Sequence, residues 1–370
     1  CCAEGPMSRP NPSLVALLAA MAVAAPALAA DYSGDWSGDF GGDGGFRTAY
    51  PTEPGDWAGL GDKDDPLKLE FATRYWYSMG TQTFTDSAGS FTSNDTSHIG
   101  ELELRIEDHS TNVYAKALGG YAFKMDGDFT DPYSVGSIID GKVGYAGADI
   151  GYNIWGDNNG NGFGALAGYM YWNNSPNTDR FGYTTATSSD DIGYDPTTGE
   201  TFVPMDSSAN NVDVHLLRLG MQGKAELGGM FDITGELAAV PYAKVNGIIG
   251  SDQTSTLYDF SVFPGGNISS VKASPTELDG WGYGAMADVL VGYHPTENLA
   301  IRVGGRAWYL QGTADVTYDQ ATIGNPSDSD AINPPNFDTP PAFAKQTFIE
   351  PANPFSMFRY GLLAEISYSF

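Results

Sequence analysis

The feature that most constrains this chain is a series of long segments in which apolar and polar side chains alternate. In the first, Leu67, Leu69 and Phe71 share one face, whereas Lys68 and Glu70 share the other. A period of two is that of a β-strand whose faces meet different surroundings. No 3.6-residue period is sustained, so the sequence predicts an all-β domain. Ten segments carry the pattern, around residues 67–77, 102–106, 113–124, 143–154, 163–172, 212–226, 231–245, 278–294, 299–310 and 358–370.

Most of these segments exceed the five or six residues of a common strand, and they suit the nine to eleven that a tilted strand needs to cross a bilayer. Tyr, Trp and Phe lie near segment ends, as in the aromatic girdles of membrane barrels. Nothing in the sequence protects a sheet edge, and closure into a barrel removes edges. The predicted fold class is therefore a closed antiparallel up-and-down transmembrane β-barrel of about ten strands.

The connections between segments alternate strictly in length. Short turns at one rim and long loops at the other are typical of outer-membrane barrels, whereas a soluble β-protein has no reason for such parity. The short connections are 108–112, 155–162, 227–230 and 295–298. The long ones are about 80–97, 125–141, 173–211, 247–277 and 311–357.

The N-terminal sequence predicts export. Arg9 precedes an apolar stretch from Leu14 to Ala25, and the small-residue motif Ala27-Leu28-Ala29 follows, which together are typical of a secretory signal peptide. We expect residues 1–30 to comprise upstream residues and this signal, 31–65 a flexible acidic Gly/Asp-rich segment, and 66–370 the barrel. Both cysteines precede Met7, so the mature chain does not rely on disulfides.

Composition excludes two other classes of protein. Asp and Glu outnumber Lys and Arg by 46 to 18, for a net charge of −28, so no nucleic-acid partner is expected. A hydrophobic fraction of 41% excludes a chain that is disordered throughout.

Residues 66–370 resemble bacterial outer-membrane β-barrel proteins of the porin-like and opacity-like kind. The resemblance includes the C-terminal Ile366, Tyr368 and Phe370, whose alternating pattern with an aromatic last residue resembles the assembly signal of that class. It implies the outer membrane of a Gram-negative cell, reached through a cleaved signal peptide. Implied partners are membrane lipid, lipopolysaccharide and the barrel assembly machinery, and the oligomeric state stays open.

Ten strands enclose a narrow lumen, close to the size that side chains fill. The polar faces carry mixed charges, which favour a cross-linked interior because unpaired buried charge is costly. The candidate lumen-lining residues are Glu70, Arg74, Glu101, Glu103, Arg105, Asp288, Arg302 and Arg306. The prediction is a non-enzymatic protein with a structural or surface-interaction role; the alternative is a small cation-preferring channel.

A second alternative is a protease similar to the omptins, ten-stranded outer-membrane enzymes that use an Asp pair opposite an Asp-x-His motif. The matching residues here are Asp126 and Asp128, and Asp213 with His215. Asp213 and His215, however, share parity with the apolar Leu217, so a bulge would have to turn them inward.

The sequence predicts no cofactor and no transition-metal site. Residues 157–162 fit only the first half of a calcium-binding loop, and the twelfth position is Gly168. Asp-rich loops, such as 190–206 and 315–338, leave weak Ca²⁺ or Mg²⁺ binding open as an alternative to surface hydration.

We expect the mature protein to begin at Ala30 or Asp31, because the small-residue motif marks a signal peptidase site. N-terminal sequencing of protein purified from membranes measures this directly. Retention of Arg9 in that material would contradict export by a cleaved signal.

Overall fold

A computed structural model describes residues 67–370 except 88, 131, 133–134, 157–160, 178–181, 207–209, 228–229, 250–259, 264–267 and 328–336. The described residues belong to one compact unit, residues 66–370. The expected signal peptide and acidic segment lie outside the described residues. No helix in the described part is long and apolar enough to cross a membrane.

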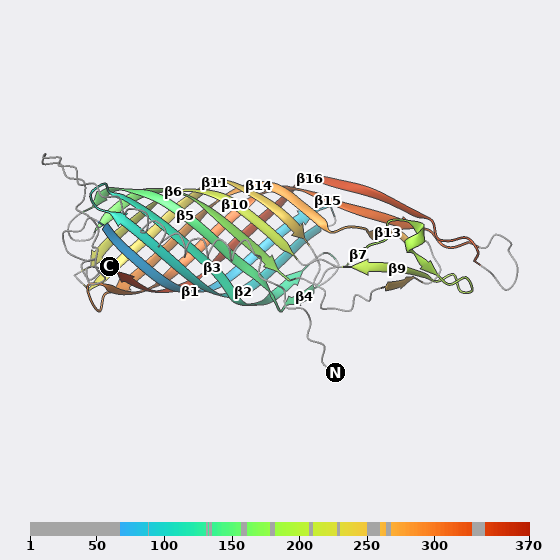
Figure 1. Cartoon of the computed structure of the whole chain (residues 1–370), viewed down its shortest axis with the longest axis horizontal. Helices are drawn as coiled ribbons and strands as arrows, with labels where there is room; N and C mark the ends of the chain where they lie inside the picture. Colours follow the sequence, from blue (N-terminus) through green and yellow to red (C-terminus); the bar gives the residue numbers. More distant parts are fainter. Residues whose placement is uncertain are drawn as a thin grey trace, which may run out of the picture. The chain divides into compact units, whose positions relative to one another are not determined.

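Ten antiparallel strands close into a ring (Figure 1). Each pairs with its neighbours in the order β15-β14-β11-β10-β6-β5-β3-β2-β1-β16, and β16 closes the ring by pairing with β15 as well as β1. The fold class expected from the alternation is confirmed. The strands are β1 (Leu67–Asp86), β2 (Gly89–Asp108), β3 (Val113–Thr130), β5 (Gly141–Gly156), β6 (Gly162–Pro176), β10 (Asn211–Leu227), β11 (Phe231–Ile249), β14 (Thr276–Tyr293), β15 (Leu299–Ile323) and β16 (Phe343–Ser369).

The two ends of the ring differ. At the turn rim, short connections join β2 to β3, β5 to β6, β10 to β11 and β14 to β15. At the opposite end, the loop rim, β15 and β16 continue beyond the other strands into a lobe (Figure 1). The lobe and its surroundings contain the short strands β4 (Val135–Ile138), β7 (Tyr183–Thr184), β8 (Gly193–Tyr194), β9 (Thr201–Asp206), β12 (Phe260–Phe263) and β13 (Ile268–Lys272), with a 3₁₀ turn at Ser189–Asp191.

The prediction of a long loop is wrong at one of the five positions. Residues 80–97 form a hairpin, because β1 continues to Asp86 and β2 begins at Gly89. Much of the expected loop 311–357 is likewise strand, since β15 and β16 pair as far as Ile323 and Phe343. These extensions carry Thr, Ser and Asn and lack the apolar alternation that marked the other strands.

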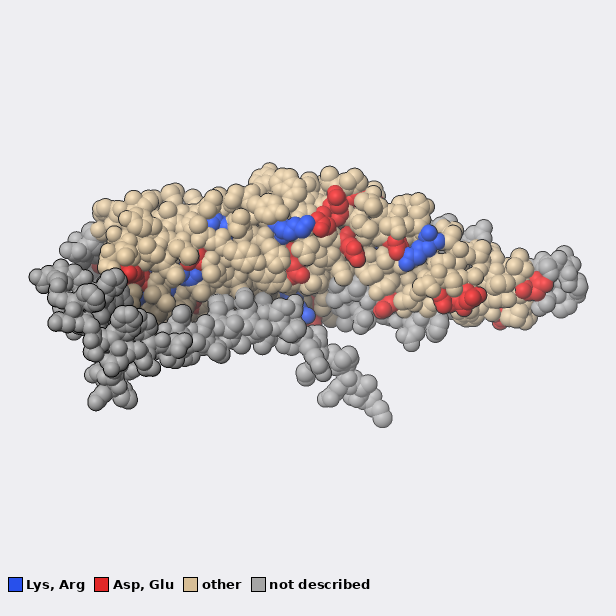
Figure 2. All heavy atoms as spheres, turned by 45° about the horizontal axis from the view of Figure 1, so that its top comes forward, with Lys and Arg blue, Asp and Glu red and all other residues tan. Residues whose placement is uncertain are grey.

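The outer wall carries a band of exposed apolar side chains. Leu219, Leu237, Val289 and Leu362 are each more than half exposed, and charged side chains are sparse on the face seen in Figure 2. Aromatic residues bound this band on both sides. Exposed examples toward the turn rim are Tyr152, Phe163, Phe231, Tyr293 and Tyr368, and toward the loop rim Tyr77, Tyr169, Tyr242, Trp281 and Tyr309.

The last strand closes the ring through its terminal residues. Phe370 donates its backbone N–H to the Leu69 carbonyl at 2.8 Å, and its ring packs on Tyr368 with centroids 4.8 Å apart. Ile366 and Tyr368 are 58% and 43% exposed, so the candidate assembly signal presents its apolar face outward.

Deleting Phe370 is expected to impair assembly, because closure loses a backbone bond and the outward aromatic residue. Fractionation and heat-modifiable migration on gels measure the folded barrel. Phe370→Tyr, which preserves the ring and the backbone bond, is the matched control. A truncated chain that assembles at the level of the full chain would contradict this account.

Candidate functional site

The inner face of the ring gathers charge that the apolar band of the outer face lacks. Every arginine among the described residues points inward, and Arg218, Arg306 and Arg359 are each 1–3% exposed. Guanidinium groups in such surroundings require carboxylate partners, because an unpaired buried charge costs several kcal/mol, on the order of 3–5. The candidate site of this protein is therefore its lumen.

Nearest the turn rim, Arg302 joins strands from opposite sides of the closure. Its guanidinium lies 2.9 Å from Glu70, 2.6 Å from Glu365 and 3.2 Å from Asp232. Next to it, Arg74 contacts Glu101 at 3.0 Å and also pairs with Glu103 and Glu365. The shared Glu365 connects the two arginines into one cluster.

A second cluster occupies the facing wall. Lys116 contacts Asp149 at 3.2 Å and also pairs with Glu236. Arg218 contacts the same Asp149 at 2.9 Å and the same Glu236. Two cations thus share two carboxylates, and the four side chains tie β3, β5, β10 and β11 together.

Arg306 connects strands across the interior. Its guanidinium lies 2.6 Å from Glu101 and 2.9 Å from Asp288. The Tyr145 hydroxyl donates to Glu101 at 2.6 Å. A Cβ at Gly120 would lie 2.3 Å from the Tyr145 ring, so glycine is required for that ring to cross the neighbouring strand.

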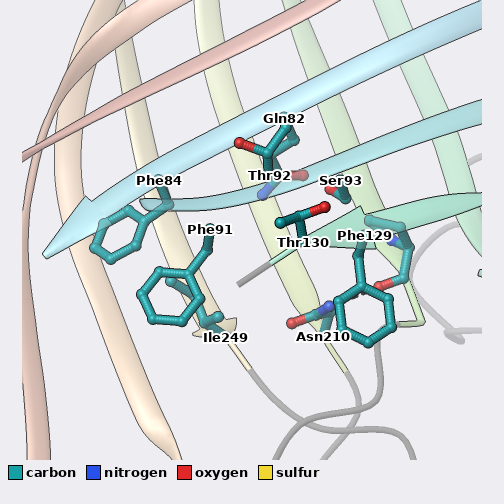
Figure 3. A pocket seen from close by; sticks show the side chains of 10 residues that line it. Gln82, Phe84, Phe91, Thr92, Ser93, Phe129, Thr130, Asn210 and Ile249 are labelled. Atoms are coloured by element: carbon teal, nitrogen blue, oxygen red, sulfur yellow. Dashed lines mark hydrogen bonds between the residues drawn. The ribbon is translucent and has the colours of Figure 1, made fainter. Parts of the chain in front are cut away.

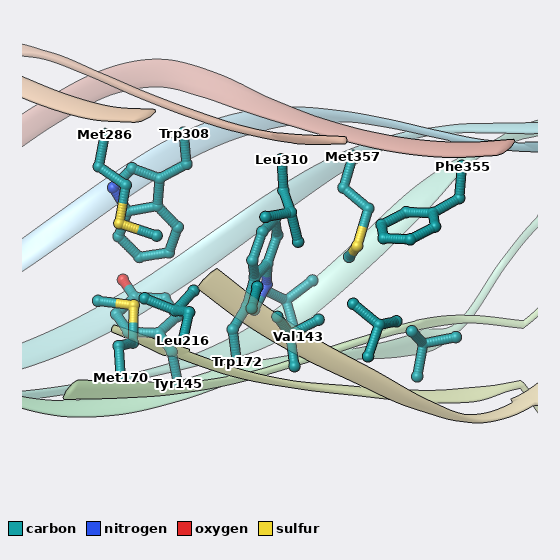
Figure 4. Close-up of a cluster of buried hydrophobic side chains, with 14 of the residues drawn as sticks. Val143, Tyr145, Met170, Trp172, Leu216, Met286, Trp308, Leu310, Phe355 and Met357 are labelled. Atoms are coloured by element: carbon teal, nitrogen blue, oxygen red, sulfur yellow. The ribbon is translucent and has the colours of Figure 1, made fainter. Parts of the chain in front are cut away.

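Apolar side chains fill the next part of the lumen toward the loop rim. The rings of Trp76 and Tyr145 each lie near Trp308, with centroids 4.8 Å apart in both pairs, and Trp172 lies 5.7 Å from Trp308. Figure 4 shows methionine and aliphatic side chains from facing walls meeting around these rings. The Arg306 guanidinium lies 5.0 Å from the Trp76 ring, where the ionic part meets the apolar one.

A separate ion pair lies among these apolar residues. Arg359 contacts Asp95 at 2.8 Å, donates to Ser78 at 2.7 Å and to Asn174 at 2.9 Å. Ser97 donates to Asp95 at 2.6 Å. Both charges are buried, at 1% and 6% exposure, so the pair is desolvated.

At the loop rim the lumen contains a small cavity, whose lining side chains are drawn in Figure 3. Its walls include Phe84, Phe91, Phe129 and Ile249, and its volume is about 20 Å³. A single water molecule needs about 10–15 Å³ by the same measure. The cavity therefore has no room for a solute the size of a sugar or an amino acid.

All eight residues assigned to the lumen from the sequence lie on the inner face. Seven belong to the ion pairs already described; Arg105 donates to Gln222 at 2.7 Å and lies 4.0 Å from the Tyr114 ring. Sequence reasoning missed Arg218 and Asp95. Each stands in the alternation at an inward position, between outward neighbours, so parity alone contains the signal for both.

The four candidate protease residues are not brought together in the lumen. Asp126 and Asp128 are exposed on the outer face of β3, and Asp126 pairs with Lys124 at 3.0 Å. Asp213 and His215 lie on the outer face of β10, and Tyr169 contacts His215 at 2.6 Å. The bulge between Leu217 and Leu219 places its extra residue on β11, so the dyad is not turned inward.

Several loop carboxylates accept hydrogen bonds from backbone N–H groups of the turns in which they lie. Asp191 accepts N–H bonds from Thr187 and Ser188, and these bonds lower the pKa of Asp191. Asp195 accepts from the Thr197 N–H at 2.7 Å, which likewise lowers its pKa. In the part of the chain that the structure describes, no group of three or more His, Cys, Asp or Glu is arranged to hold a metal ion.

No protein-family model matches the sequence, and a search of curated proteins finds no match. Solved structures with a similar fold are outer-membrane barrels. The outer-membrane protease OmpT from Escherichia coli is 10% identical over 83% of this chain and 98% of its own, with a TM-score of 0.46. The translocator domain of the autotransporter NalP from Neisseria meningitidis is 12% identical over 85% and 92%, with a TM-score of 0.31. The toluene transporter TodX from Pseudomonas putida is 11% identical over 82% and 89%, with a TM-score of 0.26. These likenesses concern strand arrangement and transfer no function.

Proposed function

We propose that this chain is an outer-membrane barrel with a closed lumen, which acts in envelope structure or surface interaction rather than in diffusion or catalysis. The observation that carries the proposal is the filled cross-section. Ionic clusters occupy the lumen toward the turn rim, and the tryptophan-centred cluster occupies it toward the loop rim.

The outer wall supports placement in a membrane. On β11, Phe231 and Tyr242 stand eleven positions apart (231 to 242) and both are exposed, with Ile233 and Leu237 exposed between them. A tilted strand crosses the hydrocarbon core with about nine to eleven residues. So continuous an apolar surface is unfavourable in water, whereas lipid solvates it.

The lobe at the loop rim supports a role in surface interaction. The lobe has a small apolar core of its own, which includes Ile192, Val203 and Ile323. In the proposed orientation, with the turns inside the cell envelope, β15 and β16 carry this lobe outward beyond the lipid.

A small cation-preferring channel is the second candidate, favoured by the acidic residues that the chain places near the loop rim. Asp279 and Asp315 are exposed there on the outer face of β14 and β15. Such charges would concentrate cations around the rim, but the lumen is blocked by paired side chains.

Planar-bilayer recording is expected to show no stable conductance from purified protein at neutral pH. The reason is that the ionic and apolar parts both span the lumen, so no continuous water column crosses it. An open sixteen-stranded porin reconstituted in the same way is the positive control. Large, weakly selective steps would overturn the closed-lumen proposal, and small cation-selective steps would support the channel instead.

A further inference from the structure

The outer wall carries the same arrangement of four side chains twice. On each occasion a Tyr-x-Tyr sequence lies on one strand, a histidine lies opposite the second tyrosine on the next strand, and a lysine lies opposite the histidine on the third. The first copy lies on β1, β2 and β3, and the second on β6, β10 and β11. No described histidine of the outer wall lies outside these copies, so the wall uses this residue only here.

In the first copy, His98 is opposite Tyr77 on one side and Lys124 on the other. The Tyr75 hydroxyl lies 2.6 Å from His98 Nδ1, and the Tyr77 and His98 ring centroids are 5.4 Å apart. Strand β3 has an extra residue, Phe123, next to the lysine, and its ring is 68% exposed.

In the second copy, His215 is opposite Tyr171 and Lys244. The Tyr169 hydroxyl lies 2.6 Å from His215 Nδ1, and the Tyr171 and His215 centroids are 5.3 Å apart. Strand β11 also has an extra residue near its lysine. Two unrelated stretches of sequence thus build the same set of contacts, with ring spacings that agree to within 0.1 Å and interplanar angles of 70° and 47°.

The hydrogen bonds allow each copy to offer a donor. The Tyr–Nδ1 contact fits either tautomer of the imidazole; where the tyrosine hydroxyl donates to Nδ1, the neutral ring carries its hydrogen on Nε2, and an acceptor such as phosphate favours this tautomer. Among the described residues, no group accepts from Nε2 of His98 or His215. The lysines pair with Asp126 and Asp279, both more than half exposed, and such exposed pairs exchange partners at little cost.

We propose that each copy binds the phosphate of an anionic lipid headgroup, through the histidine Nε2–H and the lysine ammonium. The inference rests on the proposed membrane placement, because both copies lie in the aromatic band toward the loop rim, at the depth of the headgroups. The phosphate comes from lipid rather than from solution because Phe123 and Tyr242, both exposed, flank the lysines and would meet acyl chains.

The two copies differ in their neighbouring charges, and this difference ranks them. Two positions before the histidine the first copy has Thr96, whereas the second has Asp213, which accepts from Tyr171 and from Asn173 at 2.9 Å. Asp126 and Asp128 border the first copy, and Asp279 borders the second. Each copy thus has two carboxylates nearby, but Asp213 lies two positions from His215, whereas Asp128 is opposite Asn94, four positions from His98. The closer carboxylate repels phosphate more strongly, so the first copy binds more tightly.

Native mass spectrometry of the full chain, exchanged from phosphatidylcholine–phosphatidylglycerol vesicles into detergent, measures the lipids that stay bound. His98→Gln with Lys124→Gln is expected to weaken phosphatidylglycerol binding about tenfold, the scale of one interfacial cation and one lost donor. The same change at His215 and Lys244 has a smaller effect, and Tyr75→Phe, which frees the imidazole, has a partial one. Lys345→Gln, which breaks the exposed pair with Asp319 in the lobe, is the control and leaves binding unchanged.

Selective loss of phosphatidylglycerol, with phosphatidylcholine binding unchanged and with no competition from inorganic phosphate, supports the assignment. Equal losses in the first-copy variant and in Lys345→Gln, or no loss in either, would overturn it. Competition by inorganic phosphate would also overturn it, in favour of an ion site. A chain that does not insert into vesicles would refute the membrane placement, whereas one that inserts without lipid preference refutes only the lipid site.

Discussion

The structure depends on the pairing of charge inside a closed ring. A narrow β-barrel can neither hydrate an arginine in its interior nor expose one to lipid, so each guanidinium must find carboxylates on neighbouring or facing strands. Arg302 and Arg74 do so through the shared Glu365, on the strand that closes the ring. Closure and charge pairing therefore support each other, because the partners meet only when β16 lies between β15 and β1.

The interior is divided into parts with different physical roles. The ionic clusters fix how the strands pair, because a one-residue shift in the register of a strand would move its charged side chains from the inner face to the outer face. The cluster around Trp308 fills volume without directional demands, and the Arg306 guanidinium against Trp76 connects the two parts. What remains for interaction is the outside of the molecule, which is the apolar outer wall and the lobe at the loop rim.

Much of this architecture follows from the alternation in the sequence. The period of two assigns Glu70 and Arg74 to one face and Leu69 and Phe71 to the other, because one face is charged and the other apolar. The same rule fails for residues 80–97, because Thr, Ser and Asn occupy both faces of these strand ends and leave no apolar pattern. It is silent on partners as well, since the pairing of Arg306 with Glu101 depends on a register between strands that are not adjacent in the ring.

The candidate site shows the same division. The alternation predicts that Asp213 and His215 face outward with Leu217. In the structure both residues lie on the outer face, beside Tyr169 and Tyr171. That the same residues repeat an arrangement on β1, β2 and β3 is a property of strand register, which no local pattern contains.

A double-mutant cycle on Arg359 and Asp95 tests the central role of buried pairing most directly. Among the described lumen residues, these two form an ion pair with each other and with no further charged group. The free energy of unfolding in lipid vesicles would be measured for Arg359→Met, Asp95→Asn and both together. Each single change is expected to cost about 3–5 kcal/mol, and the double change far less than their sum. The exposed pair Lys345–Asp319, treated in the same way, should couple by less than about 1 kcal/mol. Additive losses at Arg359 and Asp95, or coupling no larger than that of the exposed pair, would contradict the account.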